Sequence, residues 1–427
     1  MEYTRQVPLH SEWDVIVCGA GPSGIAAAVT AARLGQHVML LERYGAVGGC
    51  LTLGNVSTVM GSVAPGTLGG EMDRLLNSVD VAKGIDCDAA KGILTEWLAR
   101  EGVSFRLQTP VVDTLMEGET IRGIYALTQR GLVLFKGQRI IDATGDGFVS
   151  AMAGAEVMVG RDGDGLVQPC SLMYTIDGVE STLVCNHEEH YTILPDGREY
   201  LALCREAALD GRLPPSVSIV RLYDTGVPGE RLVNATQVNG TCVLNDGDAE
   251  YAEIELRRQM TQVNEFLRKE IPGFAHIRLR SSASTLGVRE SRRITGRYIL
   301  CAEDLLAGRR FDDVVVHAAN FPIDIHNPSG GGQAETEGCP HTAQPYDIPM
   351  RALEPLKVEN LILSGRCISG SHRAHASYRV MNIAMAIGQA AGTLAAASLR
   401  EGVPVSQTNA AFVQTLLREQ GCVLEDA

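Results

Sequence analysis

The sequence predicts an α/β protein, built from a Rossmann-like nucleotide-binding domain that is discontinuous in the chain and a mixed α+β domain that caps it. Three observations support this prediction. A strand pattern, a glycine-rich turn and a helix pattern follow one another in residues 13–49. From about residue 160 to 350 the pattern changes to mixed strand and helix signals. Residues 360–398 then contain a buried strand pattern and a helix of small residues, which return the chain to the first domain.

Residues 13–49 carry the nucleotide-binding prediction. The apolar, β-branched run 14–18 has strand length, the turn Gly-Ala-Gly-Pro-Ser-Gly occupies 19–24, and the Ala-rich segment 25–34 favours helix. The glycines allow a tight turn, the approach of backbone N–H groups to a pyrophosphate, and close helix–strand packing. The next strand ends at Glu42, where a carboxylate can accept a hydrogen bond from a ribose hydroxyl. This order of features predicts dinucleotide binding. The alternative is a glycine-rich turn that serves packing alone.

The residues after Glu42 indicate which dinucleotide is bound. Gly48 and Gly49 stand at the spacing used by FAD enzymes, where the chain passes close beside the ribityl and isoalloxazine groups and bulky side chains would block it. A second strand ends in the turn Asp-Ala-Thr-Gly-Asp-Gly, 142–147, as it does where FAD enzymes return the chain to the cofactor. By itself this turn also fits an ordinary strand followed by an Asp-Gly turn. The segment 55–70, rich in Gly, Ser and Thr, is expected to form a loop under the flavin.

Several later segments extend the pattern. They are Gly-Val-Arg-Glu-Ser-Arg-Arg at 287–293, Pro-Ile-Asp-Ile-His at 322–326, Gly-Arg-Cys-Ile-Ser at 365–369, Arg-Val-Met at 379–381 and Gly-Gln-Ala-Ala-Gly-Thr at 388–393. With these motifs the chain resembles the FAD-dependent oxidoreductase family from about residue 13 to 398. The resemblance implies FAD as the cofactor and an oxidoreductase activity. It implies little about the substrate, because the family is functionally mixed.

The predicted FAD-binding domain comprises residues 1–160 and 351–427, and the predicted substrate-capping domain comprises residues 161–350. Further elements expected in the first domain are helices at 70–77, 89–101 and 408–419 and strands at 37–41, 103–107, 111–116, 121–127 and 132–135. In the cap we expect a strand at 171–176, a helix at 250–270 that ends before Pro272-Gly273, and strands at 278–286 and 314–318.

Composition narrows the classes of function. The net charge of −14 and the pI near 5.2 argue against a nucleic-acid partner, because phosphate binding needs clustered Lys and Arg. The sequence has no long run of uncharged apolar residues, and residues 1–10 have no apolar core, so we expect a cytoplasmic protein without a membrane span. The 11 cysteines include no CxxC pair, which argues against zinc, iron–sulfur or dithiol sites. The expected partner is a small-molecule substrate, and the sequence leaves a homo-oligomer open.

The residues assigned to FAD come from each of these motifs. Val112 is placed to meet the adenine, while Met381 and Asn382 precede a helix expected at 383–398, whose N-terminus is aimed at the flavin pyrimidine. Cys50 is assigned a packing role near the isoalloxazine, with a covalent flavin link as the alternative. The full set is Gly19, Gly21, Pro22, Ser23, Gly24, Glu42, Arg43, Gly48, Gly49, Cys50, Val112, Thr144, Gly145, Asp146, Gly365, Arg366, Arg379, Met381 and Asn382.

Catalysis by a flavin enzyme requires one group that moves the substrate proton, and histidine suits this role near neutral pH. The candidates are His326, His372 and His375. For each of them the alternative is structural hydrogen bonding. Arg289 and Arg292, together with Arg293, are candidates to clamp a substrate carboxylate, and a structural ion-pair network is an equal alternative. We expect His372 and Arg289 to meet across the cleft between the two domains, on the substrate face of the flavin.

The leading functional prediction is an FAD-dependent dehydrogenase or oxidase that transfers hydride between a polar small molecule and the flavin N5. One alternative is a flavin hydroxylase that uses NAD(P)H and O₂. Another is an FAD-dependent non-redox enzyme or binding protein. No metal site is predicted: His187-Glu188-Glu189-His190 has the composition of one but lacks the HExxH spacing, so we expect it on a solvated surface.

Overall fold

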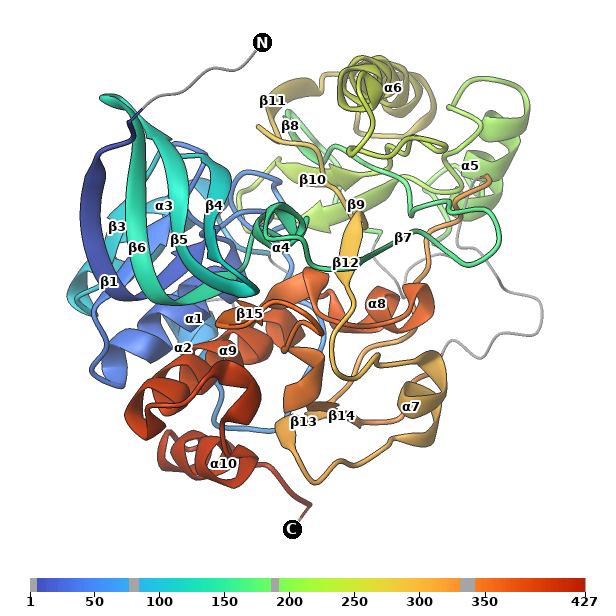
Figure 1. Cartoon of the computed structure of the whole chain (residues 1–427). Coiled ribbons are helices and arrows are strands. Elements are labelled where there is room, and N and C mark those ends of the chain that lie inside the picture. The colour runs from blue at the N-terminus through green and yellow to red at the C-terminus, as the bar shows by residue number, and fades with distance from the viewer. Residues whose placement is uncertain (1–5, 77–83, 186–191, 331–341, 427) are drawn as a thin grey trace.

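The computed structural model describes residues 6–76, 84–185, 192–330 and 342–426 of the chain. Its largest sheet has seven strands in the order β3-β2-β1-β6-β5-β4, and β15 pairs with the end of β6 (Figure 1). The strands are β1 (Leu9–Cys18), β2 (Val38–Leu41), β3 (Ser104–Arg106), β4 (Val111–Glu117), β5 (Thr120–Thr128), β6 (Gly131–Asp142) and β15 (Leu361–Leu363). Because β3, β2, β1, β6 and β15 pair in parallel, the sheet confirms the predicted Rossmann-like α/β class.

Parallel pairing places the ends of four strands side by side. Cys18, the last residue of β1, pairs with Leu41 of β2 and with Asp142 of β6, and Asp142 also pairs with Leu363 of β15. The chain therefore leaves the sheet at one edge into four segments that the sequence assigns to the nucleotide. The carboxyl edge of parallel strands is where open α/β sheets bind their ligands.

Helix α1 (Pro22–Arg33) and helix α9 (Met381–Glu401) lie in direct backbone contact. A Cβ built on Gly388 would lie 2.1 Å from the Ser23 carbonyl oxygen, and one built on Gly392 would lie 2.4 Å from the Ala27 carbonyl oxygen. The two glycines thus let the C-terminal helix pack on the first helix without intervening side chains. As a result, β15 and α9 belong to the same structural unit as β1 and α1.

Helix α9 is the one described helix long and apolar enough to cross a membrane, but 89% of that stretch is buried inside the protein, as expected of a core helix.

The remaining helices and short strands complete this first unit. The other elements are α2 (Leu68–Leu75), α3 (Cys87–Arg100), α4 (Phe148–Met152), β7 (Val157–Val159) paired with β12 (Arg292–Ile294), α7 (Ala302–Ala307), β13 (Val314–Ala319) paired with β14 (Tyr346–Pro349), α8 (His372–Tyr378) and α10 (Ala410–Glu419).

A second unit lies at the upper right of Figure 1 and has its own hydrophobic core, formed by residues between Cys170 and Ala283. It consists of an antiparallel sheet in the order β11-β8-β10-β9 and two helices. Its elements are β8 (Tyr174–Asp177), α5 (Tyr200–Leu209), β9 (Arg221–Asp224), β10 (Arg231–Asn234), α6 (Asp248–Glu270) and β11 (Arg278–Ser282). The predicted cap range, 161–350, encloses residues of both cores, because Val314 and Ile348 pack into the core of the first unit.

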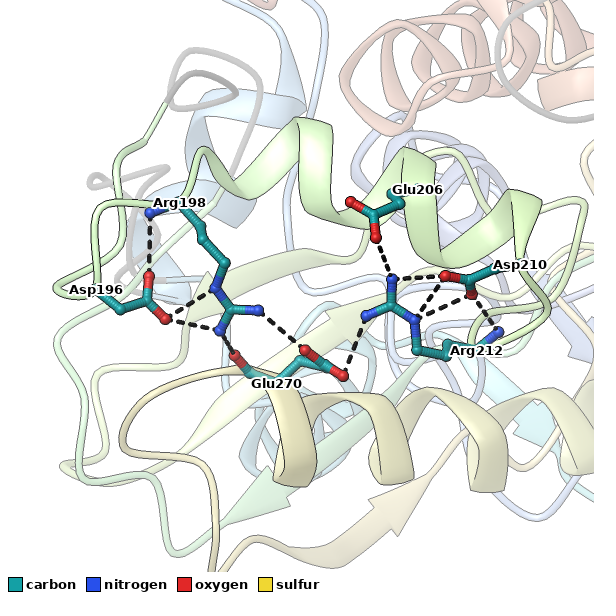
Figure 2. A network of polar contacts seen from close by, with 6 residues as sticks. All are labelled: Asp196, Arg198, Glu206, Asp210, Arg212 and Glu270. Atoms are coloured by element: carbon teal, nitrogen blue, oxygen red, sulfur yellow. Dashed lines mark hydrogen bonds and ion pairs between the residues drawn. The ribbon is translucent and has the colours of Figure 1, made fainter.

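A network of surface ion pairs holds helix α5 against the end of α6 (Figure 2). Glu270, the last residue of α6, accepts a hydrogen bond from Arg198 at 2.9 Å and pairs with Arg212 at 3.1 Å. Arg198 lies just before α5 and Arg212 just after it, so both ends of the helix are tied to one carboxylate. The outer members of the network are Asp196, Glu206 and Asp210. Individual surface pairs contribute little to stability, but a network restricts where a helix can sit.

The contact between α1 and α9 yields a test of the fold. Replacing Gly392 with Ala forces a Cβ against the Ala27 carbonyl and should lower the free energy of unfolding by about 1–3 kcal/mol, the usual cost of overpacking. The matched control is Gly92→Ala in α3, where a Cβ meets no atom within 4 Å. That control should raise stability by about 0.5–1 kcal/mol through helix propensity alone. Equal changes in the two variants, measured by chemical denaturation, would contradict the close packing.

Candidate functional site

The glycine-rich turn leaves an open, uncapped helix end at the carboxyl edge of the sheet. Gly19 has φ +99°, and a Cβ there would lie 2.4 Å from the Ala143 carbonyl oxygen. The absence of a side chain at Gly19 thus lets the turn pack against the residue that follows β6. At Gly21, the N-cap of α1, no side chain caps the helix and a Cβ would meet no atom within 4 Å. Open space in front of free helix N–H groups fits a pyrophosphate.

Glu42 is nearly fully buried and is held by the backbone around it. Its two carboxylate oxygens accept hydrogen bonds from the amides of Ala20 at 2.7 Å and Tyr44 at 2.9 Å. Burial raises the pKa of Glu42, and these amides act against that rise. Because a carboxylate offers about four acceptor sites, Glu42 keeps capacity for the ribose hydroxyl that the sequence assigns to it.

The second glycine segment packs directly on the first. A Cβ built on Gly49 would lie 2.9 Å from Gly21 Cα, and the Gly48 amide donates to the Ala20 carbonyl at 2.7 Å. Cys50 follows and is half-buried. Pairs of glycines on two segments thus create the room for a ligand that runs along the sheet edge.

The turn after β6 is organised by a residue absent from the predicted set. Asp142 is fully buried and accepts hydrogen bonds from the backbone and hydroxyl groups of both Thr144 and Ser150, at 2.7–3.1 Å. Its position at the strand end was visible in the sequence, but its saturation by these donors was not. The hydroxyl of Thr144 also accepts from the Phe148 amide, so it serves the turn itself.

Asp146 and Arg366 join this turn to the C-terminal segment. Asp146 Oδ1 lies 2.5 Å from Arg366 Nη2 and accepts from the Ser291 hydroxyl at 2.7 Å. Burial alone would raise the pKa of Asp146, but the charge of Arg366, the hydrogen bond from Ser291 and the charge of Arg43 together outweigh burial and lower it. Arg366 Nε is buried without a partner among the described residues. An ion pair with one unused buried donor fits a site that awaits a polar ligand.

The other residues assigned to FAD lie around the same edge. Arg43 is exposed, with Nη2 3.8 Å from Asp146 Oδ2, and Val112 on β4 is 40% exposed. Met381 is the first residue of α9, and the Asn382 side chain donates to the Gly61 carbonyl at 3.0 Å, which anchors the loop 55–70. The hydroxyls of Ser23 and Ser364 lie 2.5 Å apart, and Gly365 packs on Ser23. Helix α1 is therefore in direct contact with the turn that follows β15.

His372 lies in a buried ion-pair cluster. Its Nδ1 lies 2.9 Å from Glu290, which also pairs with Arg293 and accepts from the Gln168 amide at 3.0 Å. Its Nε2 is buried without a partner among the described residues. Arg293 further donates to the Gly160 and Gly370 carbonyls, so this arginine ties segments of the fold together.

His326 and Arg289 line a cavity of about 260 Å³ in the second unit. Its walls are formed by Leu201, Arg205, Ser216, Ser218, Ile219, Arg221, Asn234, Ala235, Thr236, Gln237, Arg289 and His326. Arg289 Nη1 donates to the Pro169 carbonyl at 2.8 Å. His326 Nε2 lies 3.4 Å from Asp324, whose carboxylate also pairs with Arg379 at 3.3 Å.

The electrostatics of this cluster keep its histidine neutral. Burial, and then the positive charge of Arg289, lower the pKa of His326 to about 4. Burial opposes ionisation of Asp324, yet the hydrogen bond and charge of His326 and the charge of Arg379 hold its pKa well below the usual range. At pH 7 the pair is therefore a neutral imidazole beside a carboxylate, and the imidazole can accept a proton.

The structure groups the predicted residues differently from the expectation. His372 contacts Glu290, the neighbour of Arg289, while Arg289 shares its cavity with His326; within the described residues no contact joins His372 to Arg289. Gln168 connects the two groups. Its backbone amide donates to Glu290, and its side-chain oxygen accepts from the backbone amide of His326 at 3.2 Å. Arg292 Nη1 donates to the Asp146 carbonyl at 3.3 Å.

Other predicted sites stand apart from the cavity. His375 is fully buried, and burial lowers its pKa well below the ordinary value. The described residues contain no group of three or more potential metal ligands, and His187-Glu188-Glu189-His190 lies outside the described residues. Asp324 was signalled by its place two residues before His326. No motif in the sequence indicated a site role for Gln168, Arg205 or Arg221, because each comes from a separate segment without a recognisable pattern.

A family model matches most of the sequence, and curated proteins match short segments of it. The model of the family described as FAD dependent oxidoreductase matches residues 14–417. A segment of 53 residues, 12% of this chain, is 43% identical to dihydrolipoyl dehydrogenase of Trypanosoma brucei brucei. A segment of 41 residues, 10% of this chain, is 56% identical to urocanate reductase of Eggerthella lenta. These segments cover only 11% and 7% of the lengths of the two proteins.

Solved structures resemble the chain along most of its length, at low identity. The p-nitrophenol 4-monooxygenase PnpA from Pseudomonas putida DLL-E4 aligns with 96% of this chain and 85% of its own, with a TM-score of 0.49 and 10% identity. A geranylgeranyl bacteriochlorophyll reductase-like protein from Thermoplasma acidophilum aligns with 96% of this chain and 82% of its own, with a TM-score of 0.47 and 13% identity.

Gly21 provides a test of the nucleotide site that leaves the fold intact. Gly21→Val places its side chain in the open space before α1, on a backbone with φ −71° that any residue adopts. The apoprotein should unfold as wild type does, while FAD binding weakens about 100-fold or more through crowding of the pyrophosphate. Gly19→Ala is the contrasting variant: its Cβ meets the Ala143 carbonyl, so the apoprotein itself should lose stability. Full FAD retention by Gly21→Val would overturn this placement.

The lowered pKa of His326 predicts how stability depends on pH. The folded protein keeps His326 neutral down to about pH 4, whereas the unfolded chain protonates it near pH 6.5. The unfolded state thus binds the extra proton in this window, so stability is lost as pH falls from 6.5 to 4, by up to about 1.4 kcal/mol per pH unit. His326→Gln should remove that slope, measured by denaturation at matched FAD occupancy. A pH profile unchanged by the substitution would contradict the burial of a neutral imidazole.

Proposed function

The chain belongs to the FAD dependent oxidoreductase family, its cofactor is FAD, and from this premise we propose that it is a dehydrogenase or oxidase of a polar small molecule. One observation carries the proposal: Arg289 and His326, two residues assigned to catalysis from sequence, line the same cavity, and Asp324 and Arg379 adjoin it. When bound, FAD supplies the hydride chemistry at its N5 position.

The first unit provides the groups that hold the cofactor. The N-terminus of α1 at Gly21 would hold the pyrophosphate, and Glu42 would accept a hydrogen bond from the ribose. Asp146 and Arg366 offer a carboxylate and a guanidinium at the turn after β6, and the buried Arg366 Nε is a donor still to be used. Replacing any of these groups should lower the amount of FAD that the protein retains rather than the rate of the chemical step.

His326 is the group we assign to proton transfer. Its side chain lines the cavity, it is neutral at pH 7, and Asp324 lies 3.4 Å from its Nε2. A neutral imidazole beside a carboxylate can accept the proton that a C–H or O–H group of the substrate loses. The carboxylate of Asp324 then offsets part of the burial and of the Arg289 charge that disfavour the imidazolium. Arg289 orients the substrate from the same wall.

In this proposal His372 acts on His326 through other residues and not on the substrate itself. Its Nδ1 pairs with Glu290, Glu290 accepts from the Gln168 amide, and the Gln168 side chain accepts from the His326 amide. The chain of contacts positions the backbone of His326, so we describe His372 as a positioning residue.

The proposal predicts the kinetics of flavin reduction. In a screen of polar small molecules, those that reduce the flavin anaerobically should do so about 10²- to 10⁴-fold more slowly in His326→Gln, the usual range for a positioned base, with FAD still bound. His37→Gln is the control, because that side chain is 87% exposed and directly precedes β2, at the end of the strand opposite to Glu42. Flavin reduction by NAD(P)H alone, with O₂ consumed and a hydroxylated product, would overturn the proposal in favour of a hydroxylase.

A further inference from the structure

The cavity that holds His326 is positively charged in an acidic protein. The chain has a net charge of −14, yet the three charged residues among the cavity-lining ones are Arg205, Arg221 and Arg289, and none of those lining residues is Asp or Glu. The arginines come from α5, from β9 and from the segment before β12. Segments distant in sequence therefore converge with the same sign of charge on one cavity.

Arg289 lacks an anionic partner of its own. It donates a hydrogen bond to a neutral carbonyl, that of Pro169, and within the described residues no carboxylate forms an ion pair with it at 4.0 Å or less. The neighbouring Arg379 adds a second positive charge, and burial together with that charge lowers the pKa of Arg289 to about 10. The carboxylate of Asp324 opposes this fall only in part, because it also pairs with Arg379. The buried guanidinium of Arg289 therefore remains unfavourable, and a bound anion would relieve this.

The neutral polar groups of the cavity are largely occupied by the protein. Thr236 exchanges hydrogen bonds with the backbone of Leu172, and the Gln237 amide donates to Asn239 and to the Gly330 carbonyl. The Ser216 hydroxyl donates to the Gln237 carbonyl. The side chains of Ser216, Thr236 and Gln237 are thus engaged within the protein, whereas the guanidinium groups that line the cavity have planar forks that match a carboxylate.

We propose that the substrate is a small carboxylic acid, with a carboxylate bound by Arg289 and the reacting carbon beside His326. The inference rests on the proposed function, because it takes this cavity as the substrate site. The cavity volume of about 260 Å³ restricts the acid to a small one, since ligand pockets commonly span about 300–1,000 Å³. The network around Glu270 holds α5, and with it the Arg205 side of the cavity, in place (Figure 2).

The test measures binding to the FAD-loaded protein through the flavin absorbance spectrum and by calorimetry. The probes are malonate and succinate, their neutral diamides, and inorganic phosphate. At least one acid should bind about 10-fold or more tightly than its diamide and than phosphate. Arg289→Gln should weaken that binding about 10- to 100-fold, the range of a charge-assisted pair, and Arg289→Lys should weaken it less. The FAD content and the resting flavin spectrum should stay unchanged in both variants.

The matched control is Arg278→Gln. Arg278 lies on β11 of the same sheet, exposed and paired with Asp177 at 3.2 Å, and its loss should leave acid binding at the wild-type value. Diamides that bind as tightly as the acids, tighter binding of phosphate, or equal losses in the Arg278 and Arg289 variants would each overturn the inference.

Failure of the inference and failure of the proposed function give different results. Anaerobic flavin reduction by uncharged molecules, insensitive to Arg289→Gln, would overturn the carboxylate assignment and leave the dehydrogenase or oxidase standing. Acids that bind through Arg289 without any compound reducing the flavin would support the anion site and overturn the proposed reaction.

Discussion

The parallel pairing of β1 with β2 and β6, and of β6 with β15, is the constraint on which the site depends. Because Cys18 and Asp142 stand at the same level of the sheet, and Leu41 and Leu363 pair with them, four loops begin at one edge. Each loop then needs room for its neighbour, and glycine supplies it where Gly19 meets the Ala143 carbonyl and Gly49 meets Gly21. A single shift in register would separate the glycines from the groups that they accommodate.

Contacts between the two ends of the chain connect the nucleotide edge with the cavity. Helix α9 lies on α1 through Gly388 and Gly392, which brings the segment 364–382 beside the first turn. From there Arg366 pairs with Asp146, and Arg379 reaches Asp324 in the loop of His326. The C-terminal segment therefore serves both sites: it completes the nucleotide edge and contributes a cation to the cluster that sets the protonation of His326.

The charge of the whole protein and the charge of the cavity have opposite signs. At physiological ionic strength charges are screened beyond about 8–10 Å, so an approaching ligand experiences the local arginines more than the net charge of −14. The surrounding acids are used within the protein, as Glu290 is by Arg293 and His372 and as Glu270 is by Arg198 and Arg212. Among the described residues that line the cavity there are three arginines and no acid.

The sequence by itself determined the class of fold, the cofactor and most of the sheet, because these depend on local periodicity and on glycines at a fixed spacing. Helix α9 was expected at 383–398 and spans Met381–Glu401. The strand expected at 132–135 and the strand expected to end at the turn 142–147 are one strand, β6, because β1 and β15 extend its pairing to Asp142. Helix α5 and strands β9 and β10 escaped prediction. Only the tertiary structure decided that His372 meets Glu290 and that Arg205, Arg221 and Arg289 share a cavity with His326. Those neighbours lie up to about 120 residues apart, and nothing in local pattern encodes which distant side chains the packing of two cores brings together.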